Sequence, residues 1–164
     1  MLDISSTETD DESVEKLVEC FPSLKSLSLS KTRICSPSSL TKLAHLFVLD
    51  ISSNTLDKDP KTSWSFLTQI KSLGFLKADN MDPLLSEPEK QKEESKWDEF
   101  VFVLSQIKSL KALNLSCSAF SEEACSHLSA LSELKSLDLT KCPSITFKAV
   151  KKIKGLKLWK MENL

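Results

Sequence analysis

The sequence predicts an α/β solenoid, in which short repeats stack into a curved rod with a parallel β-sheet on the concave face and helices on the convex face. Three observations predict this fold: an apolar frame that recurs along the chain, helical patterns between its copies, and a regular spacing. The chain has 164 residues, which is long enough for one domain with a core of its own. We therefore expect a single domain over residues 1–164.

The frame places apolar residues at its first, fourth and sixth positions and a polar or small residue at its ninth. Its clearest copy is Leu46, Leu49, Ile51 and Asn54 in "HLFVLDISSN". Residues two apart point to the same side of a strand, so the fourth and sixth positions face the core. The ninth position follows the strand, where a polar side chain can bond to backbone groups. Partial copies lie at both ends of the chain, and the other complete copies begin at Leu24, Leu73, Leu110 and Leu134.

This frame resembles the LxxLxLxxN motif of the leucine-rich repeat family, and the resemblance covers the chain except for residues 82–98. It implies a solenoid whose concave strands bind a protein. The segment "LDLTKCPSIT" carries Cys142 at the ninth position. It is similar to the cysteine-containing repeats of F-box-type ubiquitin-ligase receptors, a helix-containing subclass. This similarity implies an alternative function, the substrate-recognition subunit of a ubiquitin ligase.

Between the copies of the frame, apolar residues recur at helical spacing. The predicted helices cover residues 11–21, 36–46, 63–70, 97–107, 121–131 and 146–153. Two of them have marked beginnings, because Ser36 precedes a proline and Ser121 precedes two glutamates, as N-cap residues do. Equivalent leucines of neighbouring copies are mostly 22 to 27 residues apart, which leaves room for a short convex helix in each repeat.

One interval is longer than the others. It separates Leu76 from Leu113 by 37 residues, and the excess falls in a charged, proline-containing insertion at residues 82–98. We expect a solvated loop or an exposed helical extension there. The alternative is a protruding contact with a partner, since insertions in repeat proteins lie on one face. Trp97 either anchors this insertion to the convex surface or belongs to the following helix.

Residues that alternate with the core leucines predict the concave surface. Val48 points away from Leu49, and its equivalents in the other repeats form a row that we expect to be apolar, with charged residues on both sides. An apolar centre with a charged rim is typical of a protein-binding surface, although strands favour such apolar residues anyway and exposed lysines are common. The candidate partner-binding residues are Phe47, Val48, Asp50, Phe75, Lys77, Lys111, Asn114, Lys135, Asp138, Leu158 and Lys160.

Composition disfavours several classes of function. Only two glycines are present, outside any glycine-rich motif, which disfavours a phosphate-binding loop. The net charge of −1 disfavours a nucleic-acid binder, and no apolar run approaches the length of a membrane span. The five cysteines are odd in number and contain no Cys-x-x-Cys pair, so we expect no disulfide framework, zinc site or other cofactor. This cysteine usage predicts an intracellular, reducing location, the cytoplasm.

The chain carries no recognisable catalytic constellation, so we predict that it is not an enzyme. His45 and His127 lie in predicted convex helices, away from any nucleophile motif. The single arginine, Arg33, follows a strand and allows a further alternative, a GTPase activator that places this guanidinium on a nucleotide phosphate. Our leading hypothesis is a noncatalytic interaction module that binds a protein partner on its concave face.

The two ends of the chain carry opposite charge. Residues 1–24 contain seven acidic groups against Lys16, a balance of −6, and residues 141–164 contain seven lysines against Glu162, a balance of +6. Opposite charges steer association, although salt screens them, and we expect them to favour head-to-tail self-association. Both ends also fall in mid-repeat, so the chain is either a piece of a longer repeat protein or one that shields its ends by association.

Overall fold

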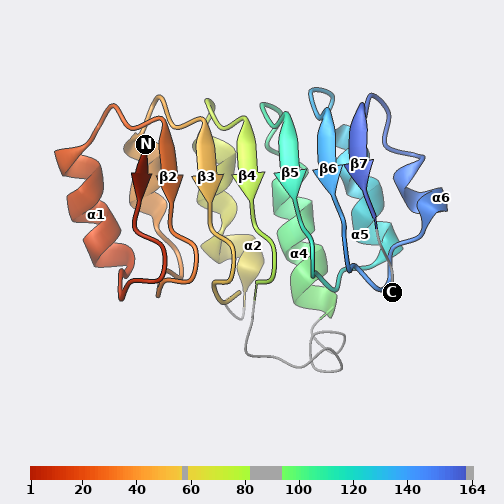
Figure 1. Cartoon of the computed structure of the whole chain (residues 1–164), viewed down its shortest axis with the longest axis horizontal. Coiled ribbons are helices and arrows are strands. Elements are labelled where there is room, and N and C mark those ends of the chain that lie inside the picture. Colours follow the sequence, from red (N-terminus) through yellow and green to blue (C-terminus); the bar gives the residue numbers. More distant parts are fainter. Residues whose placement is uncertain (57–58, 82–93, 162–164) are drawn as a thin grey trace.

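The computed structural model describes residues 1–56, 59–81 and 94–161. Its seven strands form one parallel sheet in which they follow chain order, as predicted for a solenoid (Figure 1). One face of the sheet is covered by helical elements, and we call the other face the concave face (Figure 1). The strands are β1 (Leu2–Asp3), β2 (Ser26–Ser28), β3 (Val48–Asp50), β4 (Phe75–Lys77), β5 (Ala112–Asn114), β6 (Ser136–Asp138) and β7 (Leu158–Lys160).

The register of the sheet confirms the apolar frame. Leu27 pairs with Leu49, and the line continues through the fourth position of every later copy, up to Trp159 of β7. Leu49 and Leu76 in this line are fully buried. A single repeat would leave its leucine exposed on both sides, so the stacking of neighbouring repeats is what removes this column from water.

The convex side is built from short helices. They are α1 (Asp11–Cys20), η1 (Ser38–Lys42), α2 (Pro60–Ser63), η2 (Ser65–Gln69), α4 (Glu94–Leu104), α5 (Glu122–His127), η3 (Leu128–Ala130) and α6 (Phe147–Val150), where η marks a 3₁₀ helix.

Two predicted helix beginnings have different outcomes. The Ser121 hydroxyl accepts a hydrogen bond from the backbone N–H of Ala124 (3.0 Å), so the predicted cap of α5 is confirmed. The prediction for residues 36–46 is wrong, because only the 3₁₀ helix η1 forms there and it has no side-chain cap. Serine has a modest helix propensity, and the Ser36 hydroxyl donates to the carbonyl of Ser63 in the next repeat (2.8 Å) instead.

The predicted boundary of the insertion also needs a correction. Helix α4 begins at Glu94, so residues 94–98 are helical, while residues 82–93 lie outside the described part of the chain. Trp97 belongs to this helix and is fully buried. Its ring packs edge-on against Phe100, which packs in the same way against Trp64. The apolar side chains of α4 are spaced so that they form one buried stripe. This stripe includes Trp97, so the helix begins inside the predicted insertion at residues 82–98.

In most copies of the frame the side chain at the ninth position bonds to backbone groups of the turns that follow the strands, as predicted, whereas Met81 takes this place after β4. Asn54 is buried, and its amide nitrogen donates to the carbonyls of Leu29 and Ile51 (2.8 Å each) while its oxygen accepts from the backbone N–H of Thr32 (2.9 Å). One side chain therefore ties two successive turns together. At Cys142 the thiol donates to the carbonyl of Leu115, again one repeat earlier (3.1 Å).

The residue before the ninth position has a left-handed backbone that the sequence analysis did not predict. In the described part of the chain, the non-glycine residues with positive φ all occupy this place, with φ between 49° and 58°. Such a conformation costs most side chains free energy, so the hydrogen bonds of the turn must hold it in each repeat. These residues are Ser6, Lys31, Ser53, Asn80, Cys117 and Lys141.

Candidate functional site

The concave face carries one side chain from each of β2–β7 in a line that we call the central row. The row consists of Ser26, Val48, Phe75, Ala112, Ser136 and Leu158. Phe75 and Leu158 are 49% and 58% exposed and Val48 is half-buried, so these side chains lie outside the core, as predicted. The row is not continuously apolar, however, because the small side chains of Ala112 and Ser136 interrupt it.

Two hollows result from this alternation of large and small side chains. The first hollow, of about 300 Å³, lies over β1–β4, where Ser26 leaves space. The second hollow, of about 240 Å³, lies over β4–β7, where Ala112 and Ser136 leave space. Phe75 and Lys77 line both hollows, so β4 forms the ridge between them.

Phe47 lies beside the central row, at the point where β3 begins. Its ring covers Gly74 of the next repeat so closely that a Cβ atom added to Gly74 would clash with the ring. The Lys111 ammonium lies 6.0 Å from the centre of the same ring, within the range of a cation–π contact. Phe47 is 42% exposed, which agrees with its predicted place at the edge of the concave surface.

The charged residues beside the first hollow form a compact network. The Lys77 ammonium lies 3.4 Å from a carboxylate oxygen of Asp50 and 3.7 Å from one of Asp79. Burial opposes the charge of Lys77, but the two carboxylates outweigh it and raise the pKa of the ammonium. Asp79 also accepts hydrogen bonds from the Ser52 hydroxyl (2.7 Å) and the Asn114 amide (3.3 Å). Asp79 was not among the predicted site residues, because only the tertiary structure places its carboxylate between these partners.

Three of the predicted binding residues also have a structural role. One side-chain oxygen of Asp50, Asn114 and Asp138 accepts the backbone N–H of the residue two positions later, at 2.9, 2.8 and 3.0 Å. Asp3 does the same in the first repeat. These bonds form the turn that leads out of each strand. The signal is visible in the sequence as a repeated Asp/Asn-x-Ser/Thr, which sequence reasoning did not use.

The uncompensated charge of the concave face lies at the side where the strands begin. Lys111, Lys135 and Lys157 immediately precede β5, β6 and β7, and we call them the lysine row. Over residues 1–56, 59–81 and 94–161, none of the three lies within ion-pairing distance of a carboxylate. At the other end of the strands, Lys160 faces a carboxylate oxygen of Asp138 (3.9 Å).

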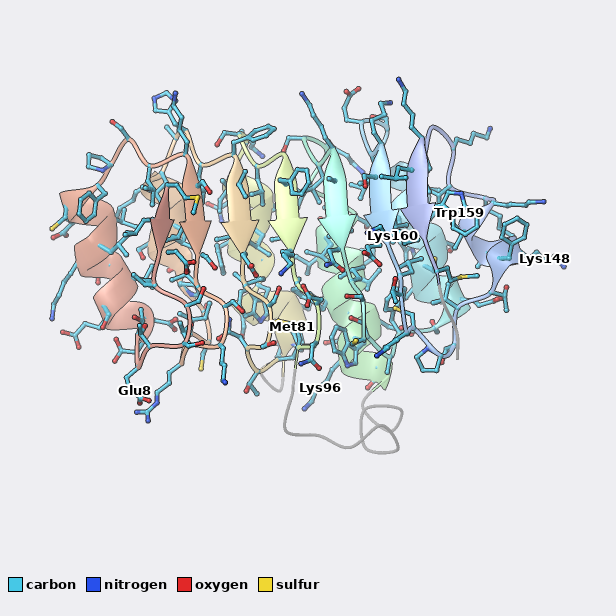
Figure 2. All side chains as sticks on the ribbon, in the orientation of Figure 1. Glu8, Met81, Lys96, Lys148, Trp159 and Lys160 are labelled. Atoms are coloured by element: carbon cyan, nitrogen blue, oxygen red, sulfur yellow. The ribbon has the colours of Figure 1, made fainter. Side chains whose placement is uncertain are left out.

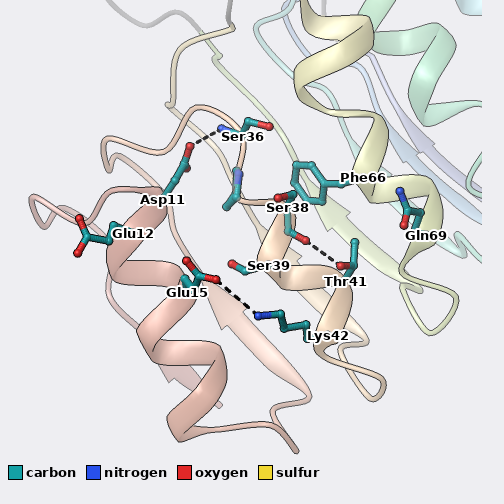
Figure 3. A pocket seen from close by; sticks show the side chains of 11 residues that line it. Asp11, Glu12, Glu15, Ser36, Ser38, Ser39, Thr41, Lys42, Phe66 and Gln69 are labelled. Carbon is teal, nitrogen blue, oxygen red and sulfur yellow. Dashed lines mark hydrogen bonds and ion pairs between the residues drawn. The ribbon is translucent and has the colours of Figure 1, made fainter.

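A further hollow, of about 540 Å³, lies on the convex side between α1, η1 and η2 (Figure 3). The Asp11 carboxylate accepts the backbone N–H groups of Cys35 (3.0 Å) and Ser36 (2.8 Å), and Glu15 pairs with Lys42 (3.6 Å). These carboxylates join α1 to the next repeat, so the bonds around this hollow serve the packing of the first two repeats.

The histidines and the arginine are not assembled into a reactive site. His45 lies in a turn after η1, and His127 ends α5, where its ring packs edge-on against Phe102. The Arg33 guanidinium pairs with the exposed carboxylate of Glu8. Among the residues described, no group of three or more His, Cys, Asp or Glu side chains is arranged to hold a metal ion. Likewise, no helix in the described part of the chain is long and apolar enough to cross a membrane.

The β7 end of the solenoid exposes apolar side chains. Trp159 occupies the core position of its repeat but is 39% exposed, because no described strand covers it. Its ring contacts Phe147 at a centroid distance of 5.2 Å. Figure 2 shows Trp159 and Lys148 at this end and Glu8 at the other, where acidic residues gather in the sequence.

Comparison of the whole chain with protein-family models and with curated proteins gives no match. Comparison of the structure with solved structures, in contrast, gives matches. The chain has the fold of a leucine-rich repeat solenoid. It is similar to an internalin (inlF) from Listeria monocytogenes str. 4b F2365, with a TM-score of 0.57 and 16% identity over 90% of this chain. It is also similar to TLR13 in the TLR13–ssRNA13 complex, with a TM-score of 0.57 and 18% identity over 94% of this chain.

The chain spans 37% of the internalin chain and 27% of the TLR13 chain. At these identities the likeness concerns the fold. The similarity to the cysteine-containing subclass, the partner, the location in the cell and the role of each predicted site residue stay predictions.

Proposed function

We propose that the chain is a noncatalytic interaction module that binds a protein partner on its concave face. The observation that carries the proposal is the exposed ring of Phe75 on the ridge between two hollows of about 300 and 240 Å³, with the half-buried Val48 in the first hollow. Exposed apolar side chains grouped among polar ones are typical of protein-binding surfaces.

Recognition on this face depends on side chains. Each strand from β2 to β6 pairs with a neighbour on both sides, so the sheet itself uses the backbone groups of these strands. A partner therefore contacts the central row together with the polar and charged residues around it, Asp50, Lys77, Asn114 and Asp138. The oxygens of Asp50, Asn114 and Asp138 that hold the turns are already occupied. Their remaining polar atoms are the ones that a partner can use.

The test is affinity capture from a cell lysate with the wild-type chain and with the double variant Val48→Lys, Phe75→Lys. Bound proteins are identified by mass spectrometry after circular dichroism has confirmed that both chains are folded. We expect at least one protein to be lost with the variant, because a lysine at either site places a charge where an apolar contact forms.

The matched control is Phe21→Lys, Phe102→Lys, which changes two exposed side chains away from the concave face, Phe21 directly after α1 (53%) and Phe102 on α4 (38%). It should keep the protein that the concave variant loses. Equal capture by all three chains would reject the concave face as the binding surface.

The same capture separates the alternative functions by the nature of the partner. A ubiquitin-ligase adaptor would support a substrate-recognition subunit, and a GTPase would support an activator. For the activator, Arg33 would have to leave Glu8, and this exposed pair is of a kind that costs little to break. Unchanged GTP hydrolysis with Arg33→Ala would remove the chemical support for that alternative.

We also propose that the protein works in a reducing, cytoplasmic compartment and that it associates head to tail. Two of its cysteines, Cys20 and Cys35, are exposed thiols, and Cys142 uses its thiol hydrogen in the turn. The exposed Trp159 at a lysine-rich end and the acidic residues at the other end support association between copies.

A further inference from the structure

We propose that the second hollow is a socket for one large apolar side chain of an acidic polypeptide segment. This inference rests on the proposed function and adds to it the chemical class of the partner. Its basis is the shape of the central row and the distribution of charge around it.

The shape of the hollow fits a single side chain. Phe75 and Leu158 stand at its two sides, and the small residues Ala112 and Ser136 lie between them on β5 and β6. Strands in a sheet are about 4.8 Å apart, so the two walls are separated by roughly 14 Å at the backbone, less the reach of their own side chains. The side chains of Leu113 and Leu137, which also line the hollow, face the core and are 3% and 1% exposed, so the small side chains of Ala112 and Ser136 and the strand backbone form the floor. A volume of about 240 Å³ with this floor and these walls suits a leucine, methionine or aromatic side chain.

At the ends of the strands, two lysines are paired with three carboxylates, which leaves a net charge of −1. Lys160 faces Asp138, while Lys77 is held between Asp50 and Asp79. An acidic partner would gain little on this side, because both lysines already face carboxylates.

The lysine row on the opposite side is different. Lys111 and Lys157 are exposed and Lys135 is half-buried, and in the described part of the chain no carboxylate pairs with them. Lys111 contacts the ring of Phe47, which leaves its charge uncompensated. The net charge beside the socket is therefore positive on one side only. A segment with Asp or Glu next to its apolar anchor matches this arrangement and is steered toward it.

The test begins with a display library of random peptides of about twelve residues, selected on the wild-type chain. The enriched peptides are synthesised, and their dissociation constants are measured with wild type, Ser136→Leu and Ser26→Leu. Ser136→Leu fills the socket with a side chain of the protein itself. Ser26→Leu makes the same change at the equivalent place of the central row, in the first hollow.

We expect the enriched peptides to share one large apolar residue with acidic neighbours. Ser136→Leu should weaken their binding by more than about tenfold, and Ser26→Leu by less than about twofold. The triple variant Lys111→Gln, Lys135→Gln, Lys157→Gln should also weaken binding about tenfold and reduce its dependence on salt. The matched control Lys148→Gln, Lys152→Gln, Lys154→Gln removes the same charge at exposed sites outside the concave strands and should change little.

Three results would overturn the socket. They are enriched peptides without acidic residues, equal binding of the peptides by Ser136→Leu and wild type, and tighter binding of a single-stranded RNA of similar length at the lysine row.

Failure of the socket can be told from failure of the proposed function. If Val48→Lys, Phe75→Lys loses its protein partner and Ser136→Leu keeps it, the concave face binds but the socket does not. If both variants keep the partner, both proposals fail.

Discussion

At the residue scale, Cys142 and Asn54 show how different side chains serve one place in the repeat. Each donates a hydrogen bond to a carbonyl of the preceding repeat, that of Leu115 (3.1 Å) or of Leu29 (2.8 Å). Both are buried, so the carbonyl would lose its partner if the donor were removed. Burial raises the pKa of the Cys142 thiol to about 12, which keeps the donor hydrogen in place above pH 9.0, where an ordinary thiol would lose it.

This shift makes stability depend on pH. In the unfolded chain the thiol of Cys142 titrates near its ordinary pKa of 9.0, whereas in the folded chain it titrates near about 12. The folded state therefore binds more protons between these values, and the free energy of unfolding falls as the pH rises above about 9. Cys142→Ser keeps a donor but does not titrate. Between about pH 8 and about pH 10.5, wild type should lose about 2 kcal/mol more than this variant in urea unfolding.

Burial also raises the pKa of the Cys125 thiol, to about 11. Wild type and Cys142→Ser share this thiol and all the lysines, so the effects of these groups on stability cancel when the two chains are compared. If the free energy of unfolding falls equally with pH in wild type and Cys142→Ser, the pKa of Cys142 is not raised in the folded chain.

At the element scale, each strand divides its residues between a buried and an exposed side. In β5, Leu113 is 3% exposed, whereas Leu158 in the central row of β7 is 58% exposed. Because the period of a strand is two, a register shifted by one residue would exchange these environments. The two leucines thus provide a comparison within one residue type.

Leu113→Ala should lower the free energy of unfolding by about 2 to 5 kcal/mol, since it leaves a cavity in the stacked core. Leu158→Ala removes the same atoms from the concave surface and should change stability by less than about 1 kcal/mol. Chemical denaturation measures both. A loss below about 1 kcal/mol for Leu113→Ala would mean that this residue is not part of the buried column.

At the scale of the whole molecule, the two ends differ in chemistry. The β7 end exposes the rings of Trp159 and Phe147 beside several lysines, and the other end is acidic over residues 1–24. A contact between unlike ends leaves one end of each molecule free to bind a further copy. Unless the rotation from one copy to the next closes a ring, such contacts generate open chains of molecules. The expected attraction combines an apolar contact, which salt does not screen, with charges that it does screen.

Sedimentation velocity should therefore show a sedimentation coefficient that rises with protein concentration, more strongly at about 50 mM than at about 500 mM salt. Trp159→Ser should weaken this association by about tenfold, because it removes the ring that a second copy would cover. Phe102→Ser is the control, since Phe102 has a similar exposure of 38% but lies on the convex helix α4. A single species at all concentrations would reject head-to-tail association.

Much of the fold could be predicted because the frame is periodic. The positions of Leu49 and Leu76 alone predict which residues pair across β3 and β4, and the structure confirms this register. The 3₁₀ form of η1 was not predicted, and the Ser36 hydroxyl, expected to cap a helix there, donates to a carbonyl of the next repeat. The left-handed residues were missed as well, because serine or lysine at such a place carries no signal of its own.

The sequence by itself determined the solenoid, the line of core leucines and the residues that face the concave side, because side-chain direction in a strand follows from position alone. Only the tertiary structure decided what that face looks like. The ring of Phe47 covers Gly74, Asp79 joins Lys77 and Asn114, and the small side chains of β5 and β6 open a hollow between larger neighbours. These features arise between repeats more than 20 residues apart, so they depend on how neighbouring side chains pack, which the pattern within one repeat does not specify.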